Sequence, residues 1–158
     1  TPGMRVFAGI DELTKAVGET VGPGPWRGID QGRVNAFADA TDDHQWIHTD
    51  PERAALGPFG GTVAHGYLTL SLLPALSKDL YRVEGLRMGV NYGLNTVRFP
   101  APLLTGARGR LTAEIVSVDP VPGGAQLVVR ATVESDAGGK PCCVAETVSR
   151  LYPQEETS

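Results

Sequence analysis

The sequence predicts an α+β fold in which a mostly antiparallel β-sheet wraps around one long central helix. Two observations carry this prediction. The segment 62–80 is long enough for a helix and is apolar nearly all the way round, which is typical of a buried helix. From about 87 to 152, apolar and polar residues alternate between short glycine-rich turns, which indicates antiparallel strands. The 158 residues, 41% of them apolar, match a single domain (1–158) with one core.

The composition excludes some classes of protein. A formal net charge of −4, with no cluster of Lys and Arg, argues against nucleic-acid binding. The longest apolar run, Val63–Leu76, is too short to cross a bilayer, and no signal-peptide pattern opens the chain. The only cysteines, Cys142 and Cys143, are adjacent, which suits neither a disulfide framework nor a metal site. We therefore expect a soluble, cytoplasmic protein with no nucleic-acid or membrane partner.

Three further helices are expected before the central one. The first lies around 10–17. The second spans about 30–40, where apolar residues recur at helical spacing and Asp30 is the expected N-cap. Asp50 followed by proline is a start signal for the third helix, which should end near Leu56.

The central helix, about 62–80, contains a proline. Pro74 cannot donate a backbone hydrogen bond, so a kink or a restart of the helix is expected there. The large apolar side chains of Tyr67, Leu68 and Leu72 are assigned to the core first, and the alternative is that one face of this helix lines an acyl tunnel.

The strand-rich half contains one irregularity. Between 87 and 99, the apolar residues occupy even positions up to Leu94 and odd positions from Val97 onward. Such a slip of one residue at Asn95-Thr96 predicts a β-bulge. The other expected strands lie around 111–115, 127–133 and 142–152, with turns at 120–124 and 136–139.

Two motifs carry the candidate chemistry: Thr41-Asp-Asp-His-Gln-Trp-Ile-His48 and Phe59-Gly-Gly-Thr-Val-Ala-His-Gly66. Asp43 and His48 place a carboxylate and an imidazole five positions apart, and both can act on one water molecule near neutral pH. The second motif adds backbone amides at the glycine-rich entry to a helix, where they can polarise a carbonyl. These are the parts needed to add water to an activated acyl chain or to remove it.

Both motifs, together with the predicted architecture, resemble the MaoC-like dehydratase family, which has the hot-dog fold and includes (R)-specific enoyl-CoA hydratases. The family's first motif reads approximately Thr-Gly-Asp-x-Asn-Pro-Ile-His, and its second Phe-Gly-Gly-x-Ile/Val-Ala-His-Gly. The segments 41–48 and 59–66 match these motifs, the second almost completely. The resemblance covers about Asp30 to Tyr152.

The resemblance implies roles for individual residues. Asp43 and His48 would be the catalytic pair, and Gly66 a backbone donor to the thioester oxygen. The reaction would be reversible hydration of a trans-2-enoyl-CoA to the (3R)-hydroxyacyl-CoA, in fatty acid metabolism, with no metal and no cofactor beyond coenzyme A as carrier. Supporting positions would be held by His65, Gly61 and Trp46.

Two positions depart from the family pattern. Asp42 stands where the family usually has glycine, and Gln45-Trp46 replaces Asn-Pro. The turn before His48 must then be fixed by packing of Trp46. A serine that some members carry near the position of Pro74 has no clear equivalent, and Ser71 is the nearest hydroxyl.

Other interpretations of these residues remain open at this stage. His44 and His48 have the spacing of a helical metal pair, but Gln45 stands where a metalloprotease needs Glu, so no metal site is expected. His65 is more consistent with a structural histidine than with a base, and Gly60-Gly61 is consistent with close packing of helix on sheet. Four arginines have two possible interpretations: they form a solvated strand face, or one or two of them bind the phosphates of coenzyme A. They are Arg87, Arg98, Arg108 and Arg110.

The expected assembly is a homodimer, because an antiparallel sheet on a single helix leaves its edges exposed. Two functions compete with the hydratase. One is an acyl-CoA thioesterase, since fold alone does not separate reactions on acyl thioesters. The other is a non-catalytic acyl-CoA binding module.

Overall fold

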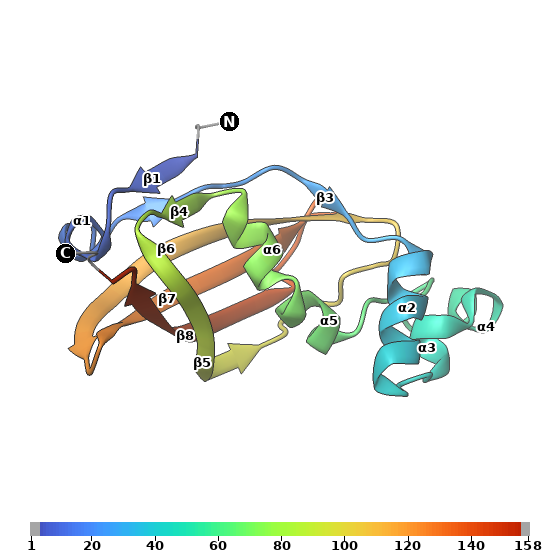
Figure 1. Ribbon diagram of the computed structural model, residues 1–158. Helices are drawn as coiled ribbons and strands as arrows, with labels where there is room; N and C mark the ends of the chain where they lie inside the picture. The colour runs from blue at the N-terminus through green and yellow to red at the C-terminus, as the bar shows by residue number, and fades with distance from the viewer. Residues whose placement is uncertain (1–3, 156–158) are drawn as a thin grey trace.

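The computed structural model describes residues 4–155. Figure 1 shows a curved sheet with the central helix lying across one of its faces and a group of shorter helices at one end. The helices are α1 (Ile10–Lys15), α2 (Gln31–Thr41), α3 (Trp46–Thr49), α4 (Pro51–Ala55), α5 (Gly66–Ser71) and α6 (Leu73–Lys78). The strands are β1 (Arg5–Phe7), β2 (Thr20–Val21), β3 (Arg27–Gly28), β4 (Tyr81–Val83), β5 (Leu86–Arg98), β6 (Arg108–Val121), β7 (Gly124–Ser135) and β8 (Cys143–Pro153).

The main sheet has the strand order β2-β6-β7-β8-β5, and β3 also pairs with β6. All of these pairs are antiparallel, so the predicted hairpins are confirmed. A two-residue turn joins β6 to β7, with Val121 paired to Gly124. A Cβ atom at Gly124 would overlap the carbonyl of Leu151, so only glycine allows this close approach of β7 to β8.

The long strand β5 forms the free edge of the sheet and is strongly curved (Figure 1). Its pairing with β8 shifts register between Leu94 and Thr96, which confirms the predicted bulge. The alternation in β5 does not separate a buried face from a solvated one, because Val90 and Tyr92 are both largely exposed, at 42% and 60%. The strand has a neighbour on one edge only, and most of its residues lie outside the cover of the helices.

The central helix is shorter than predicted and has two parts. Helix α5 begins at Gly66, and α6 restarts at Leu73 with Pro74 in its first turn, so the predicted restart is confirmed. The prediction that the helix begins at 62 is wrong, because Val63 is in an extended segment and forms a β-bridge with Leu104.

Burial of the central helix also differs from the prediction. Leu68 is buried as expected, and Leu72 is partly buried. Tyr67, however, is 70% exposed, so its assignment to the core is wrong. The helix packs on the sheet along one side only, and in this chain Tyr67 lies on the other side.

The two local start signals are confirmed. The Asp30 carboxylate accepts a hydrogen bond from the Arg33 amide (2.8 Å) at the start of α2, and Asp50 accepts one from the Arg53 amide (3.1 Å) at the start of α4. The expected loop between these helices contains an additional short helix, α3. The short parallel pair of β1 with β4 was not predicted either, because three-residue strands carry almost no periodic signal.

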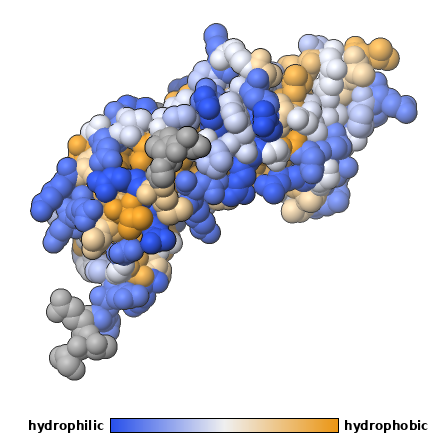
Figure 2. All heavy atoms as spheres, turned by 90° about the horizontal axis from the view of Figure 1, so that it is seen from above, coloured by the Kyte–Doolittle hydropathy of each residue, from blue (hydrophilic) through white to orange (hydrophobic). Residues whose placement is uncertain are grey.

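One hydrophobic core fills the space between the helices and the concave face of the sheet. Its centre includes Leu68, Leu76, Ile115 and Val129, all 6% exposed or less. The face of the molecule seen from above in Figure 2 is largely hydrophilic, with hydrophobic residues in separate patches. Among residues 4–155, no helix has the length and hydropathy needed to cross a bilayer.

Candidate active site

The structure brings together three residues of the two motifs. Asp43, His48 and His65 each offer a carboxylate oxygen or ring nitrogen, and these atoms lie within 4.8 Å of one another. Asp43 follows the end of α2, His48 lies in α3, and His65 immediately precedes α5. The cluster therefore lies where the group of helices at one end of the sheet meets the central helix (Figure 1).

His48 is held by the second motif. Its Nδ1 lies 2.6 Å from the carbonyl oxygen of Val63, and because a carbonyl only accepts, Nδ1 carries the proton. The Val63 amide donates in return to the carbonyl of Ile47 (2.9 Å). These two bonds join the motifs and leave Nε2 of His48 as the nitrogen that can gain or lose a proton. The ring is 8% exposed.

His65 contacts both Asp43 and His48 and helps to position them. Its Nε2 donates to the backbone carbonyl of Asp43 (3.0 Å), and its ring stacks on His48 with centroids 3.9 Å apart and an interplanar angle of 23°. Phe37 packs on the ring of His65 at 4.9 Å between centroids. The ring is 2% exposed, and its Nδ1 has no hydrogen-bond partner within residues 4–155. His65 thus fixes both the backbone of Asp43 and the plane of His48.

Gly66 is the first residue of α5, and within the described chain no acceptor takes its N–H. The ring of Phe99 packs directly against its Cα, so a Cβ atom here would lie 3.0 Å from the ring carbons. This close approach explains why the position needs glycine. A cavity of about 270 Å³ adjoins it, and Phe59 and Cys142 contribute to its wall. The N–H of Gly66 is thus free to donate to a bound carbonyl.

The residues before His48 are fixed by packing. The guanidinium of Arg53 stacks over the Trp46 ring at 4.3 Å, and Gly57 lies against the same ring, where a Cβ would come within 3.0 Å. This agrees with the expectation that Trp46 replaces the family's proline by packing. Gly60 is explained by its positive φ of 73°, whereas nothing in the structure explains a need for glycine at Gly61.

Asp42, the departure from the family's glycine, lies at the C-cap of α2. Its φ of 58° and ψ of 28° place it in the left-handed region, the only residue other than glycine with a positive φ among those described. The backbone conformation that glycine adopts freely is thus kept here by an aspartate, at a steric cost.

We expect Asp42→Gly to raise the free energy of unfolding by about 0.5–1 kcal/mol, because glycine lacks the Cβ that disfavours this conformation. Asp42→Ala should lower it, since alanine has the Cβ without a side chain able to form local hydrogen bonds. Urea unfolding of the three proteins checks both signs. A glycine variant less stable than the wild type would contradict the assignment of strain to this residue.

One positioning residue was missed by sequence reasoning. Gln31, in the first turn of α2, donates from Nε2 to the carbonyl of His48 (2.7 Å) and accepts at Oε1 from the hydroxyl of Thr62 (2.6 Å). It therefore ties α2, α3 and the segment before α5 to one another. No local pattern in the sequence marks it, because its partners are 17 and 31 residues away.

The predicted absence of a metal pair at His44 and His48 agrees with the geometry, because His44 is exposed and pairs with Asp39 (2.9 Å). The cluster of Asp43, His48 and His65 has suitable atoms for a metal. The two imidazole rings are nearly parallel, however, so their nitrogen lone pairs do not converge on one point as a tetrahedral site requires.

The four arginines considered for phosphate binding fall into two groups. Arg108 and Arg110 form ion pairs with Asp136 (2.8 Å) and Glu134 (2.6 Å). The backbone and side chain of Arg108 hydrogen-bond Asp136 and lower the pKa of that carboxyl. Arg87 and Arg98 have no carboxylate partner among the described residues. Arg98 directly precedes Phe99, so it is the one nearer to Gly66.

Both cysteines are buried, and burial raises the pKa of each thiol to about 11. Cys142 lines the cavity beside Gly66, where an electrophilic thioester would be bound. At pH 8 the thiolate fraction of such a group is roughly one in a thousand.

We expect iodoacetamide to modify the native protein about a hundredfold more slowly than the urea-unfolded chain. Equal rates, followed by mass spectrometry, would contradict this.

Comparisons with known proteins agree on one family. The model of the MaoC-like domain matches residues 12–138. The 3-hydroxyacyl-thioester dehydratase Z of Mycobacterium tuberculosis is 53% identical over 148 residues, which are 93% of this chain and 98% of that protein.

Two solved structures share the fold. R-hydratase PhaJ1 from Pseudomonas aeruginosa superposes with a TM-score of 0.71 at 21% identity, covering 96% of this chain and 92% of that one. The monoamine oxidase regulatory protein of Archaeoglobus superposes with a TM-score of 0.75 at 24% identity, covering 98% and 100%.

The sheet, the central helix and these superpositions define a hot-dog protein, which confirms the predicted fold class. The chain belongs to the MaoC-like dehydratase family, as the resemblance of its two motifs indicated.

Proposed function

We propose that the protein is an (R)-specific enoyl-CoA hydratase, which adds water reversibly to a trans-2-enoyl-CoA to give the (3R)-hydroxyacyl-CoA. The observation that carries this proposal is the convergence of Asp43 and His48 beside Gly66, with Nε2 of His48 and the N–H of Gly66 both unused by the protein. The 53% identity to a 3-hydroxyacyl-thioester dehydratase supports it.

In the proposed reaction, Asp43 and His48 hold one water molecule between them. The pair removes a proton from the water as its oxygen bonds to the β-carbon of the substrate. Electrons of the C=C double bond move toward the thioester carbonyl, whose developing negative charge the N–H of Gly66 stabilises. The pair then returns the proton to the α-carbon.

The sum of these steps is the addition of one water molecule, with no change of oxidation state. The proposed chemistry therefore needs no metal and no organic cofactor. Treatment with a chelator should leave the rate unchanged. His65 acts here as a positioning residue, because its Nε2 is occupied by the backbone of Asp43.

The test is loss of the conjugated enoyl absorbance when the purified protein is mixed with crotonyl-CoA, with a thiol reagent in a parallel sample. Loss of absorbance without release of free thiol establishes the hydratase. Release of thiol would instead support the acyl-CoA thioesterase, because only hydrolysis frees coenzyme A. Tight binding of acyl-CoA with neither signal would support a non-catalytic binding module.

We further propose a homodimer formed through strand β5. This strand is 13 residues long and forms a free sheet edge. It exposes the large apolar side chains of Met88 and Val90. Sedimentation should give twice the chain mass of 16.7 kDa, and Val90→Lys should shift the protein toward the monomer. A wild-type monomer at micromolar concentration would overturn this proposal.

We place the protein in the cytoplasm. Cys142 and Cys143 are free thiols in the core, as a reducing compartment allows. Fractionation of cells that express the protein tests this location.

A further inference from the structure

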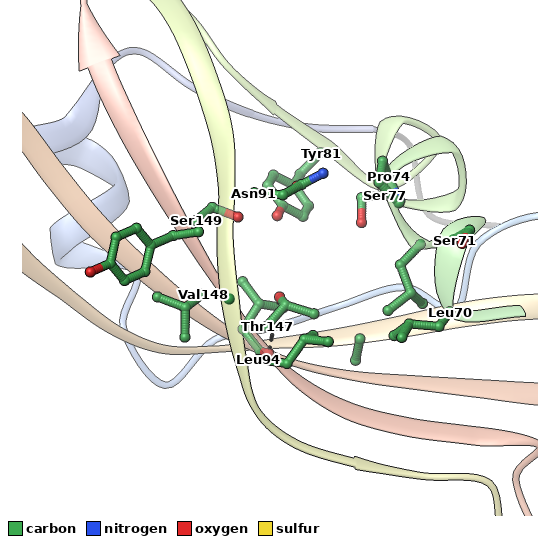
Figure 3. Close-up of a pocket in the computed structure, with 15 residues that line it drawn as sticks. Leu70, Ser71, Pro74, Ser77, Tyr81, Asn91, Leu94, Thr147, Val148 and Ser149 are labelled. Atoms are coloured by element: carbon green, nitrogen blue, oxygen red, sulfur yellow. Dashed lines mark hydrogen bonds between the residues drawn. The ribbon is translucent and has the colours of Figure 1, made fainter. Parts of the chain in front are cut away.

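A second, larger cavity, of about 490 Å³, lies between the central helix and strands β5, β7 and β8 (Figure 3). Leu70, one helical turn after Gly66, is one of its lining residues. Pockets of about 300–1,000 Å³ hold ligands of drug size. The butenoyl group of crotonyl-CoA is far smaller than that, so the cavity has room for a longer acyl group.

The two ends of the cavity differ in their free polar groups. Ser71 and Thr147 lie beside Leu70 and Leu94, but their hydroxyls already donate to backbone carbonyls (Figure 3). Leu70 and Leu94 line the end nearer to Gly66, and Ser77, Tyr81 and Asn91 line the far end (Figure 3). The sequence order on both walls agrees with this direction. On the central helix, Gly66 begins α5 and Ser77 lies in α6, eleven residues further along the chain. On β5, Leu94 is closer than Asn91 to Phe99, the residue that contacts Gly66.

The polar groups at the far end have no partners in the protein. Among the described residues, the hydroxyls of Ser77, Tyr81 and Ser149 and the amide of Asn91 make no side-chain hydrogen bond. Ser149 is paired with Asn91 across β8 and β5, so these two lie on the same wall. By contrast, the hydroxyl of Ser71, in the same cavity, donates to the Tyr67 carbonyl at 2.7 Å.

Asn91 is exposed, whereas Ser77, Tyr81 and Ser149 are partly buried. A partly buried donor without a partner is unfavourable unless a water or ligand atom meets it. Tyr81 is the strongest case. Its ring packs edge-on against Phe7, and burial raises the pKa of its phenol, so the hydroxyl remains a donor at any ordinary assay pH. A plain alkyl chain reaching this end would displace water from Ser77 and Tyr81 and offer nothing in return.

We propose that the preferred acyl group is of medium length and carries an oxygen function, a hydroxyl or a carbonyl, at its distal end, where Ser77 and Tyr81 bind it. This inference rests on the proposed function, because it takes the thioester to lie at Gly66. The near end, where the hydroxyls are already bonded to the backbone, holds the methylene chain, and the free hydroxyls of the far end bind its terminal group.

The experiment compares two saturated, unreactive ligands, decanoyl-CoA and ω-hydroxydecanoyl-CoA, by titration calorimetry. We expect the hydroxylated ligand to bind on the order of tenfold more tightly, which is the value of about one net hydrogen bond to a buried donor. Because no reaction is involved, this result does not depend on whether the protein hydrates enoyl thioesters. The same preference should appear in kcat/KM for the two corresponding trans-2-enoyl-CoA substrates.

Variants assign the effect to the far end. Tyr81→Phe and Ser77→Ala each remove one hydroxyl, and each should bring the ratio of the two affinities closer to one. Ser71→Ala is the matched control, because that hydroxyl is already bonded to the backbone. Equal affinity of the wild type for the two ligands would overturn the inference, and so would a loss of preference as large in Ser71→Ala as in Ser77→Ala.

The two failures can be told apart. Hydration of crotonyl-CoA without any preference for the hydroxylated ligand would contradict this inference and still support the proposed function. A clear preference in binding without hydration of any enoyl thioester would do the reverse.

Discussion

Asp43→Asn is expected to lower kcat for hydration of crotonyl-CoA by about 10²–10⁴-fold, the usual range for loss of a general acid–base group. The amide has nearly the shape of the carboxylate but cannot take a proton from water. His48→Ala should have an effect of similar size, because it removes the Nε2 atom that would exchange a proton with the bound water. The two losses should not add, since both residues act on the same water.

His44→Ala is the matched control for these variants. This histidine is only one residue from Asp43, but its ring is exposed and pairs with Asp39 outside the cluster. It should keep wild-type activity within a factor of about two. Circular dichroism and the urea midpoint show whether each variant is folded. A folded Asp43→Asn protein with more than a tenth of wild-type kcat would rule out the proposed pair.

Much of the fold could be predicted because its signals are local. The caps at Asp30 and Asp50 each act within three residues, and the alternation in the strands repeats every two. Proline interrupts the hydrogen bonding of a helix when it lies in the interior, so the restart of the helix near Pro74 could be predicted from the sequence. The candidate site could be predicted for a different reason. Two motifs at a fixed separation resemble those of one family.

The features that were missed depend on contacts distant in sequence. The central helix begins at Gly66 because Val63 is held in an extended segment by Ile47 on one side and Leu104 on the other. The exposure of β5 depends on which edge of the sheet remains free, and Tyr67 is exposed because of the side on which its helix packs. The spacing of apolar residues predicts which face of a helix or strand is apolar. It does not show whether another part of the chain covers that face.

The orientation of the His48 imidazole is the clearest example of a feature that depends on contacts distant in sequence. Neither motif contains Gln31, and yet its side chain bonds to both, at the His48 carbonyl and the Thr62 hydroxyl. The His48 ring also depends on the Val63 carbonyl, one residue beyond Thr62. Any shift of the segment 62–64 relative to α3 would therefore rotate the imidazole that the proposed reaction uses.

Gln31→Leu is accordingly expected to reduce both stability and activity. It leaves the hydroxyl of Thr62, which is 7% exposed, without its acceptor, and the total cost should be about 2–3 kcal/mol in the free energy of unfolding. Because His48 is positioned through the same contacts, kcat should fall by about tenfold or more with KM changed less. Asn35→Ala is the control, since it removes only the exposed hydrogen bond of the Gln31 amide (2.9 Å) and leaves the bonds to His48 and Thr62 in place.

Gln31→Glu separates positioning from stability. The carboxylate can still accept from Thr62 but cannot donate to the His48 carbonyl, so α3 loses its tie to α2 while the other contact remains. Its stability should lie between those of the wild type and Gln31→Leu, whereas kcat should fall nearly as far as in Gln31→Leu. If kcat instead followed stability through the three proteins, Gln31 would act on the fold alone, and the bond to His48 would have no part in orienting the imidazole.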